Sequence, residues 1–176
     1  MGCSATLSNI SLGCLKNAGG VKAILYTNYE NIKTKTLDST TGQITAITLE
    51  TDKKWYKIEF QKQNSQLTST RTIDATNGVA FVTSNLTVNV KKMGIENRKA
   101  VEAICQADTA WLVKDQNDQV WFLGYDNPVT ASANTSDTGM NLSDPNQYVI
   151  TVQDMSQELP FNCSDDVWET AEGTVA

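Results

Sequence analysis

The feature that most constrains this chain is the alternation of apolar and polar residues at every second position. In WYKIEFQ, residues 55–61, the apolar Tyr56, Ile58 and Phe60 alternate with charged residues. In VAFVTSNLTVNVK, residues 79–91, aliphatic residues alternate with Thr and Asn. Successive side chains of a β-strand point to opposite faces, so this period of two predicts strands with one buried face.

Further segments of this kind are bounded by Gly, Asp, Asn and Pro, the residues typical of turns. Thr, Ser and Asn are abundant and only 19% of the residues are charged, a composition that favours strands and turns over helices. The other expected strands lie at 20–29, 44–49, 110–114, 119–125 and 147–153, with weaker candidates at 67–73 and 128–133.

The hydrophobic period changes once, in residues 94–107. There Ile95, Val101, Ile104 and Cys105 recur at close to helical spacing, and polar residues fill the positions between them. The pattern predicts an amphipathic helix of about three turns that packs on a sheet or closes the end of a barrel.

We therefore expect a mainly β fold: a β-sandwich or rolled antiparallel sheet of about eight strands with one flanking α-helix at about 94–107. A chain of 176 residues suffices for one such domain. The expected organisation is an N-terminal arm at 1–19, one β-sandwich domain at 20–160 with long polar loops at 31–43 and 62–78, and an acidic C-terminal tail at 161–176.

The chain contains no histidine. Histidine is the usual general base and the commonest metal ligand, so Ser-His, Cys-His and His-ligated metal mechanisms are excluded. The sequence also lacks a phosphate-binding glycine loop, a dinucleotide-binding fingerprint and a Gly-x-Ser-x-Gly elbow. We expect no enzymatic activity, no cofactor and no metal site.

Charge is divided unevenly along the chain. The net charge of −6 disfavours electrostatic capture of nucleic acid or of an anionic membrane, and no apolar stretch is long enough to span a bilayer. Residues 1–99 hold 13 basic and 7 acidic groups, a net charge of +6, whereas residues 100–176 hold one basic group, Lys114, and 13 acidic ones, a net charge of −12. The asymmetry predicts a particle with a basic and an acidic end, unless strands from both halves interleave and mix the charges.

The four cysteines are Cys3, Cys14, Cys105 and Cys163. An even number suggests disulfides in an exported chain, but the N-terminus has neither the basic region nor the apolar run of a signal peptide. Because no Cys-x-x-Cys pair occurs, a zinc site is not expected.

Two polar groups carry both a functional and a structural interpretation. Asp115, Asn117 and Gln119 alternate as in part of a calcium loop, but the glycine and the distal glutamate of such a loop are missing, so a hairpin turn is expected. Asp154 and Glu158 could form a pair of catalytic carboxylates. An acidic C-terminal region, however, contains such pairs by composition alone.

The four tryptophans are a third candidate group. Trp55, Trp111, Trp121 and Trp168 could form a platform on which sugars or bases stack. Because Trp111 and Trp121 fall on opposite strands of one expected hairpin, core or subunit-contact roles are the simpler interpretation.

The order of these features resembles a family of small structural proteins from the tails and necks of tailed bacteriophages, especially phages of Bacteroidetes, including crAss-like phages. The similarity covers most of the chain and rests on pattern and order. It departs at Gln147, where a glycine would precede the tyrosine, and in the tail after Cys163. The matching pieces are Cys3, Cys14 and the GGVK run at 19–22, Val88-x-Val90-x-Lys92-Met93 before the helix, WLVKDQNDQVWFLGYDNPV at 111–129, Asp144-x-x-x-Tyr148-x-Ile150-x-Val152, and Glu158-x-Pro160.

The resemblance implies a tail-tube-like virion protein that is made in the host cytoplasm. Such proteins form rings, with hexameric symmetry expected, whose inner β-surface lines a DNA channel and whose arms reach the next ring. Implied partners are copies of the same chain, other tail or neck proteins and genomic DNA as the sliding contents of the channel, with no membrane. The residues that we nominate as subunit contacts are Lys33, Lys35, Asp38, Lys62, Arg71 and Trp168.

Three features of the chain agree with this expectation. Long polar loops suit arms that order on assembly, strand edges need partners that a ring supplies, and an acidic subunit lets DNA slide. Complementary charges at the two ends of a ring would set the polarity of stacking.

Three alternatives remain open. The first is a neck ring, tail terminator or head-decoration protein of the same virion. The second is an exported carbohydrate-binding β-sandwich that uses the tryptophans, and the third is an enzyme that relies on carboxylates.

Overall fold

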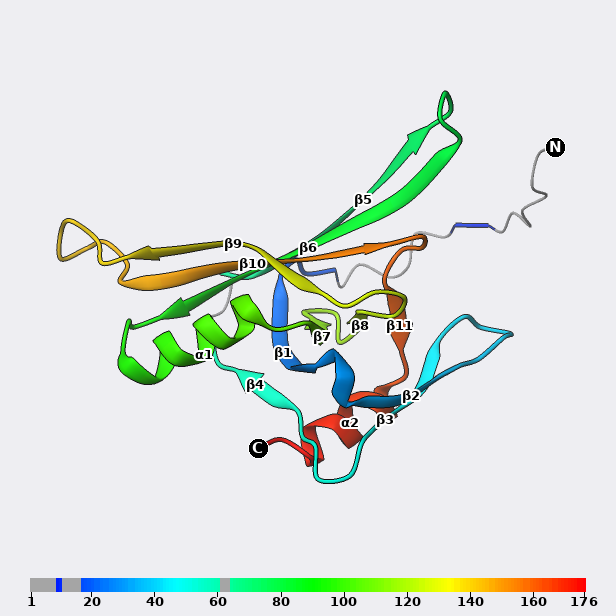
Figure 1. Ribbon diagram of the computed structural model, residues 1–176, viewed down its shortest axis with the longest axis horizontal. Coiled ribbons are helices and arrows are strands. Elements are labelled where there is room, and N and C mark those ends of the chain that lie inside the picture. Colours follow the sequence, from blue (N-terminus) through cyan, green and yellow to red (C-terminus); the bar gives the residue numbers. More distant parts are fainter. Residues whose placement is uncertain (1–8, 11–16, 61–63) are drawn as a thin grey trace.

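Two β-sheets, crossing one above the other, organise residues 9–10, 17–60 and 64–176, the part of the chain that the computed structural model describes (Figure 1). The expectation of a mainly β, sandwich-like fold is confirmed. Eleven strands are present in these residues, more than the eight expected, together with two α-helices and one short 3-10 helix, Tyr29–Asn31.

The larger sheet has seven strands in the order β2-β3-β11-β8-β7-β1-β4. Neighbours are antiparallel except for β3 and β11, which are parallel. Its strands are β1 (Val21–Asn28), β2 (Ile32–Leu37), β3 (Ile44–Leu49), β4 (Tyr56–Ile58), β7 (Thr109–Asp115), β8 (Val120–Leu123) and β11 (Phe161–Cys163).

The smaller sheet has four antiparallel strands in the order β5-β6-β10-β9. It consists of two long hairpins, β5–β6 and β9–β10, joined through the β6–β10 pair. Its strands are β5 (Gln66–Asp74), β6 (Val79–Lys91), β9 (Thr130–Asp137) and β10 (Gln147–Ser156).

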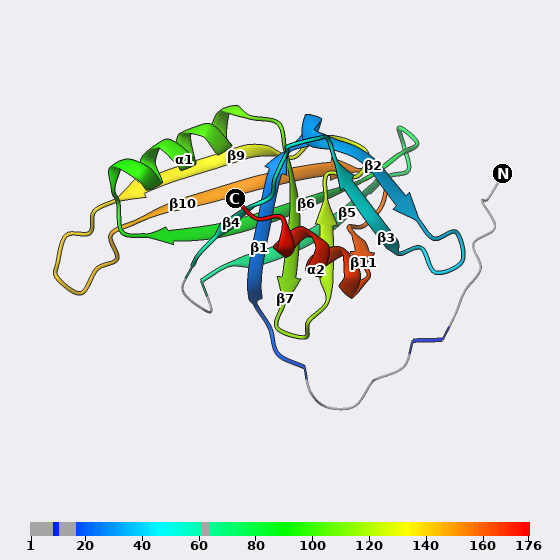
Figure 2. The ribbon, with the colours of Figure 1, turned by 90° about the horizontal axis from the view of Figure 1, so that it is seen from below.

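Two apolar clusters lie on opposite faces of the larger sheet. Leu86 and Ile150 of the smaller sheet pack against Ile24, Trp111 and Val113 in the first cluster. The second cluster packs the other face of the sheet against the C-terminal helix, α2 (Asp165–Gly173), as Figure 2 shows from below. Strand β7 is therefore buried on both sides, and its first five residues, TAWLV, are all buried. A strand that is covered on both faces requires such a continuous apolar run.

Helix α1 (Ile95–Gln106) forms where the period changes, as predicted. Val101 and Ile104 are buried against the first cluster, but Ile95 is 74% exposed and does not belong to the buried stripe. The helix lies under β9 and β10 and covers the inner face of that end of the smaller sheet (Figures 1 and 2).

The expected polar loops are largely strands. Within 31–43, β2 spans Ile32–Leu37, and within 62–78, β5 spans Gln66–Asp74. Both are edge strands of their sheets. An edge strand can keep polar side chains on most of its surface because the sheet covers only one of its sides, and polar residues there discourage unwanted pairing. Apolar alternation is therefore weak in both segments, so the sequence did not reveal β2 and gave β5 only as the weaker candidate at 67–73.

The expected acidic tail, residues 161–176, forms secondary structure. Residues 161–163 form β11, and α2 begins directly after Ser164. Val167, Trp168 and Ala171 lie on one side of α2 and enter the second apolar cluster. Acidic residues in the first turn of α2 interact favourably with the positive end of its dipole, so the acidic composition assists the helix.

The described part of the expected arm, residues 17–19, is tied to the β7–β8 turn. The Ala18 N–H donates to Asn117 Oδ1 over 2.9 Å, and Asn117 Nδ2 donates to Asn17 Oδ1 over 3.1 Å. Residues 1–8 and 11–16, with Cys3 and Cys14, lie outside the described residues.

Trp168→Ala is expected to destabilise the fold by about 3–5 kcal/mol, because it removes a buried indole from the contact between α2 and the larger sheet. Urea denaturation followed by circular dichroism measures this change. Glu169→Ala changes the neighbouring exposed residue and should stay within about 0.5 kcal/mol of the wild type. Equal stability of the two variants would show that α2 does not contribute to the core.

Candidate subunit-contact surfaces

The outer face of the four-stranded sheet carries uncharged side chains across its whole centre. Side chains alternate along each strand, and those opposite the buried Leu86 and Ile150 point away from the body. We call this surface the polar sheet face. Its members are Gln66, Thr68, Thr70 and Thr72 of β5, Phe81, Thr83, Asn85, Thr87 and Asn89 of β6, Val149, Thr151, Gln153 and Met155 of β10, and Thr130, Ala133 and Thr135 of β9.

Hydrogen bonds between neighbouring strands fix several of these side chains. Gln153 Nε2 donates to Asn85 Oδ1 over 3.1 Å, and the Thr87 and Thr151 hydroxyls lie 3.3 Å apart. Charged groups lie only at the margins of the face, with Asp74 at one end and Lys91 opposite Gln147 at the other. The face is thus polar, pre-ordered and without a fixed cation in its central rows.

Both edges of the smaller sheet are open. In the part of the chain that the structure describes, no strand pairs with the outer side of β5 or of β9. These strands have nine and eight residues, so each presents a long row of backbone N–H and C=O groups. Such edges favour pairing with another chain.

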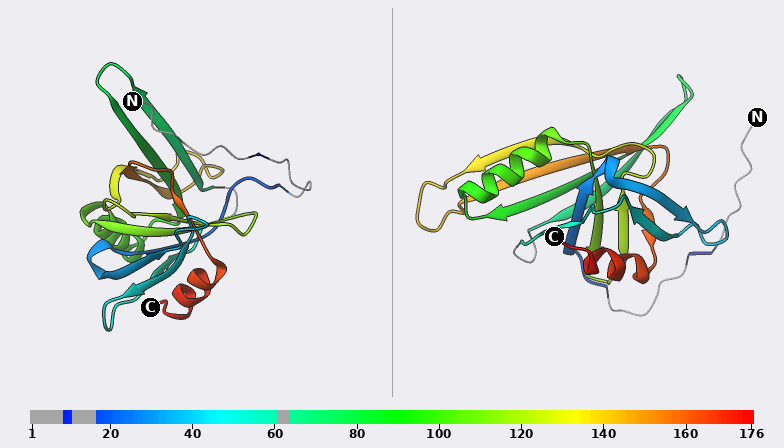
Figure 3. Two further views of the ribbon diagram at one scale, coloured as in Figure 1. Left: turned by 90° about the vertical axis from the view of Figure 1, so that its right-hand side faces the viewer. Right: turned by 60° about the horizontal axis from the view of Figure 1, so that its bottom comes forward.

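The two hairpins of this sheet are staggered. Pairing between β5 and β6 runs from Gln66–Thr87 out to Asp74–Val79, whereas β10 leaves β6 at Val82. At the opposite end, β9 and β10 continue to Asp137–Gln147, beyond the start of β5. The hairpins consequently project from opposite ends of the sheet, as Figure 3 also shows.

The nominated contact residues do not gather in one place. Lys33 and Arg71 are exposed on edge strands β2 and β5. Asp38 accepts bonds from the Thr40 N–H and the Thr41 hydroxyl in the β2–β3 turn, and these bonds lower the pKa of its carboxyl. Lys62 lies outside the described residues, and Trp168 is buried in the core, so Trp168 is not available as a subunit contact.

Lys35, also nominated, has an internal role. Its Nζ donates to the carbonyl oxygens of Gly124 and Tyr125 over 3.2 and 2.5 Å and lies 4.7 Å from the centre of the Tyr29 ring. The ammonium thus holds the segment after β8 against β2, and cation–π attraction adds to these bonds.

Asp154 is a buried carboxylate that the sequence did not mark as structural. It is 2% exposed, its Oδ2 accepts the Gly124 N–H over 3.2 Å, and its Oδ1 has no hydrogen-bond partner among the described residues. Burial raises the pKa of this carboxyl, and the nearby Asp126 acts in the same direction. Glu158 is exposed, so Asp154 and Glu158 do not form a matched pair of buried acids.

Gly124 allows this contact. Its φ of +98° lies in the left-handed region, and a Cβ at this position would come within 3.2 Å of the Ala110 Cβ. A side chain is therefore excluded where the end of β8 approaches both β7 and Asp154.

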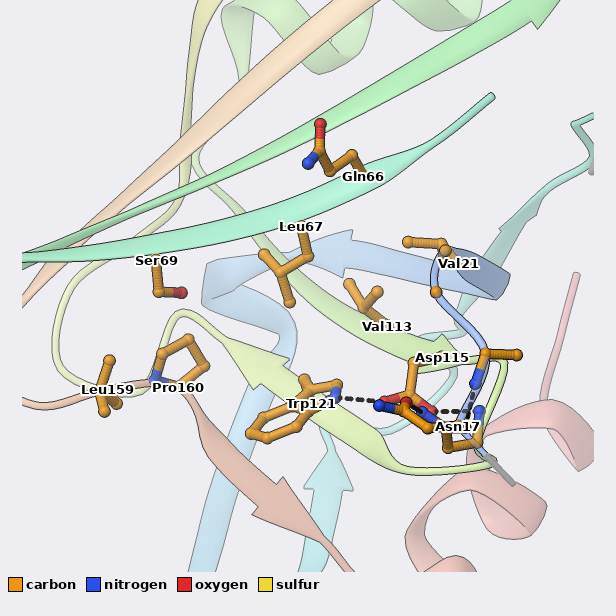
Figure 4. A pocket seen from close by; sticks show the side chains of 14 residues that line it. Asn17, Val21, Gln66, Leu67, Ser69, Val113, Asp115, Trp121, Leu159 and Pro160 are labelled. Atoms are coloured by element: carbon orange, nitrogen blue, oxygen red, sulfur yellow. Dashed lines mark hydrogen bonds between the residues drawn. The ribbon is translucent and has the colours of Figure 1, made fainter. Parts of the chain in front are cut away.

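The tryptophans do not form a platform. Trp55, Trp111 and Trp168 are buried, and the Trp111 indole N–H donates to Thr109 Oγ1 over 2.7 Å. Trp121 is half-buried and lines a largely apolar pocket of about 480 Å³ between β5 and the β7–β8 hairpin (Figure 4). A carbohydrate-stacking surface built from several tryptophans is thus ruled out for this fold.

The Asp115 segment is a turn, as expected. Asp115 Oδ1 accepts the N–H groups of Asn117 and Gln119 over 2.8 and 2.9 Å, and Oδ2 accepts the Trp121 indole N–H over 3.1 Å. Among the described residues, no group of three His, Cys, Asp or Glu side chains is placed to hold a metal ion. Burial raises the pKa of the Cys163 thiol to about 12.

No family model matches the chain, and a search of curated proteins finds no match either. Within residues 9–10, 17–60 and 64–176, no helix has the length and apolar character needed to cross a membrane.

Asp154→Asn is expected to raise the free energy of unfolding more at pH 7 than at pH 4. The pKa of Asp154 in the folded state lies above its ordinary value of 3.8. Protonated Asp154 therefore contributes its full stabilisation of the folded state below pH 3.8, and this stabilisation is lost as the pH rises through the raised pKa. The amide stays neutral and removes the effect. Urea denaturation at several pH values measures the difference between variant and wild type.

The exposed Glu158→Gln controls for the loss of one negative charge. A constant difference between Asp154→Asn and wild type from pH 4 to pH 7 would contradict the raised pKa.

Proposed function

We propose that this protein is a structural virion subunit that forms rings by joining its four-stranded sheet, edge to edge, with copies of itself around a DNA channel. The observation that carries the proposal is the pair of open edges, β5 and β9, on a sheet whose outer face is uncharged. The resemblance to tail-tube-like proteins of tailed phages points to the same role.

Strand direction allows this closure. The sheet has four strands that alternate in direction, so β5 and β9 run oppositely. Rotation of copies about one axis then brings β9 of one subunit antiparallel to β5 of the next. Repeated pairing of this kind closes a barrel and leaves no free edge in the smaller sheet.

Charge supports pairing between unlike edges. The β5–β6 hairpin, residues 66–91, contains Arg71, Lys91 and Asp74, a net charge of +1. The β9–β10 hairpin, residues 130–156, contains three aspartates and no basic residue, a net charge of −3. In this proposal the uneven charge of the two halves of the sequence separates the two edges of the smaller sheet and attracts unlike edges to each other. In the larger sheet, strands from both halves interleave.

The polar sheet face suits the lining of a DNA channel. Lys and Arg bind DNA by neutralising phosphates and releasing counterions, and the central rows of this face offer no such group. Thr, Asn and Gln side chains keep the surface hydrated without holding the phosphates in place. A neck ring or tail terminator would use the same lateral contacts, but hairpins that project from both ends favour a subunit that stacks.

Size measurement and negative-stain imaging of the purified protein test the proposal directly. Rings or short tubes with a central channel are expected, in equilibrium with smaller species on dilution. A compact monomer at every concentration and ionic strength would overturn it.

Like charges placed on both edge strands are expected to abolish rings. Thr68 of β5 and Thr130 of β9 belong to the polar sheet face and lie at the two ends of one row of the sheet, with Asn85 and Gln153 between them, so T68E/T130E brings two carboxylates to each proposed boundary and costs several kcal/mol there. T68K/T130E should restore rings because the same boundary then holds opposite charges. Sedimentation velocity measures the ring fraction.

Thr83→Glu with Thr151→Glu is the matched control, because it adds the same charge to the same face on central strands β6 and β10. Ring formation by T68E/T130E at the wild-type level would contradict closure through these edges.

A further inference from the structure

The turn that closes the β5–β6 hairpin contains an Asn-Gly pair, Asn77 and Gly78. Asn77 is the only asparagine in the sequence that is followed by a glycine. Both residues are exposed, and they lie in the turn 75–78, between the paired strand ends Asp74 and Val79. Asn and Gly readily adopt the backbone conformations of tight hairpin turns, which explains their presence here. The pair also has a chemistry of its own.

The backbone nitrogen of Gly78 is accessible as a nucleophile. Gly78 has a φ of +66°, and beyond the adjacent residues no heavy atom lies within 4 Å of the position that a Cβ would take. Among the residues that the structure describes, no group accepts a hydrogen bond from the Gly78 N–H. In the β2–β3 turn, by contrast, the Gly42 N–H donates to the Asp38 carbonyl oxygen over 2.8 Å. The nitrogen that follows Asn77 is therefore free to react.

An asparagine side chain beside such a nitrogen closes a succinimide ring. The Gly78 nitrogen loses its proton and attacks Cγ of Asn77, so that a C–N bond forms, the Cγ–Nδ2 bond breaks and the side-chain amide leaves as ammonia. Water then adds to one of the two ring carbonyl carbons and opens the ring to aspartate or isoaspartate. Water is the only co-reactant, and the rate of the intramolecular step depends on how often Cγ and the nitrogen reach the attacking geometry.

The folded turn restrains the Asn77 side chain. Asn77 Nδ2 donates to Asp74 Oδ2 over 2.7 Å, while Asp74 Oδ1 accepts the N–H groups of Thr76 and Asn77 over 2.9 and 3.2 Å. These bonds lower the pKa of the Asp74 carboxyl and keep it ionised at neutral pH. Hydrogen bonds to an ionised acceptor are stronger than those between neutral groups. The side-chain amide is thus held toward the residue that precedes the turn, whereas the attacking nitrogen follows Asn77.

We propose that Asn77 and Gly78 form a self-modification site and that Asp74 is the positioning residue that keeps this site unreacted in the folded protein. Ring closure needs a rotation that presents Cγ of Asn77 to the Gly78 nitrogen, and the amide must release Asp74 for that rotation. Either product adds one negative charge and takes the net charge of the β5–β6 hairpin, residues 66–91, from +1 to zero. Isoaspartate also lengthens the backbone of the turn by one methylene group.

Peptide mapping by mass spectrometry tests the site in the full-length chain. Cleavage after Arg71 and Lys91 releases residues 72–91, which contain Asn77 together with Asn85 and Asn89 of β6. The protein is incubated at mildly alkaline pH, which favours loss of the Gly78 proton, and fragmentation locates the mass gained when an amide NH2 is replaced by OH. Asn77 should gain this mass, while Asn85 and Asn89 serve as internal controls and should stay unchanged.

Asp74→Ala is expected to speed the modification of Asn77 at least about tenfold, because it removes the acceptor of the Asn77 amide and of two N–H groups. The wild-type chain in urea gives the rate of an unrestrained Asn77. D74A should approach that rate, the folded wild type should stay well below it, and D74N, which keeps one acceptor oxygen, should lie between them.

Asp38→Ala is the matched control. Asp38 accepts hydrogen bonds from Thr40 and Thr41 in the β2–β3 turn, as Asp74 does in its own turn, but no asparagine lies there. This variant should modify Asn77 at the wild-type rate, so a general effect of opening one turn is distinguished from the effect of releasing Asn77.

Three results would overturn the role of Asp74: a folded wild type that reacts as fast as the chain in urea, equal rates in D74A and D38A, or modification of Asn85 or Asn89 in D74A, which would indicate general unfolding. An Asn77 that stays unmodified in urea would overturn the site itself. The reaction needs only one chain, so a protein that forms no ring, and thereby contradicts the proposed function, can still carry this site.

Discussion

Burial of β7 on both of its faces is the constraint on which the rest of the structure depends. Ile150 and Leu86 of the smaller sheet cover one side, and Val167 and Trp168 of α2 cover the other. This packing fixes the larger sheet as a rigid middle layer. The smaller sheet is anchored to it through its inner face alone, so its edges, outer face and hairpin ends remain outside the core.

That anchoring explains why the candidate contacts all belong to the smaller sheet. Its inner face satisfies the hydrophobic requirement of the fold, which leaves the outer face free to carry Thr, Asn and Gln. Open edges β5 and β9 run in opposite directions and lie beside hairpins of unlike charge. In the proposed ring, lateral pairing would thus use the edges of the smaller sheet, with the larger sheet as its support.

The sequence predicted what apolar periodicity can encode. The buried strands, α1 and the Asp115 turn follow from alternation, helical spacing and turn residues. Strand β2 escaped prediction and β5 was only a weaker candidate at 67–73, because edge strands carry little apolar alternation. Helix α2 escaped because its nine residues hold only a short apolar stripe in an acidic segment. Trp168 was nominated as a contact because sequence cannot separate a buried aromatic from an interfacial one.

Amide hydrogen exchange, read by mass spectrometry on assembled and on diluted protein, tests the central claim most directly. Backbone amides at the open edges of β5 and β9 should become protected on assembly, because each edge gains a partner strand, while edge strand β2 of the larger sheet should exchange equally in both states. Equal exchange of β5 and β9 in assembled and dissociated protein would contradict closure of the ring through these strands.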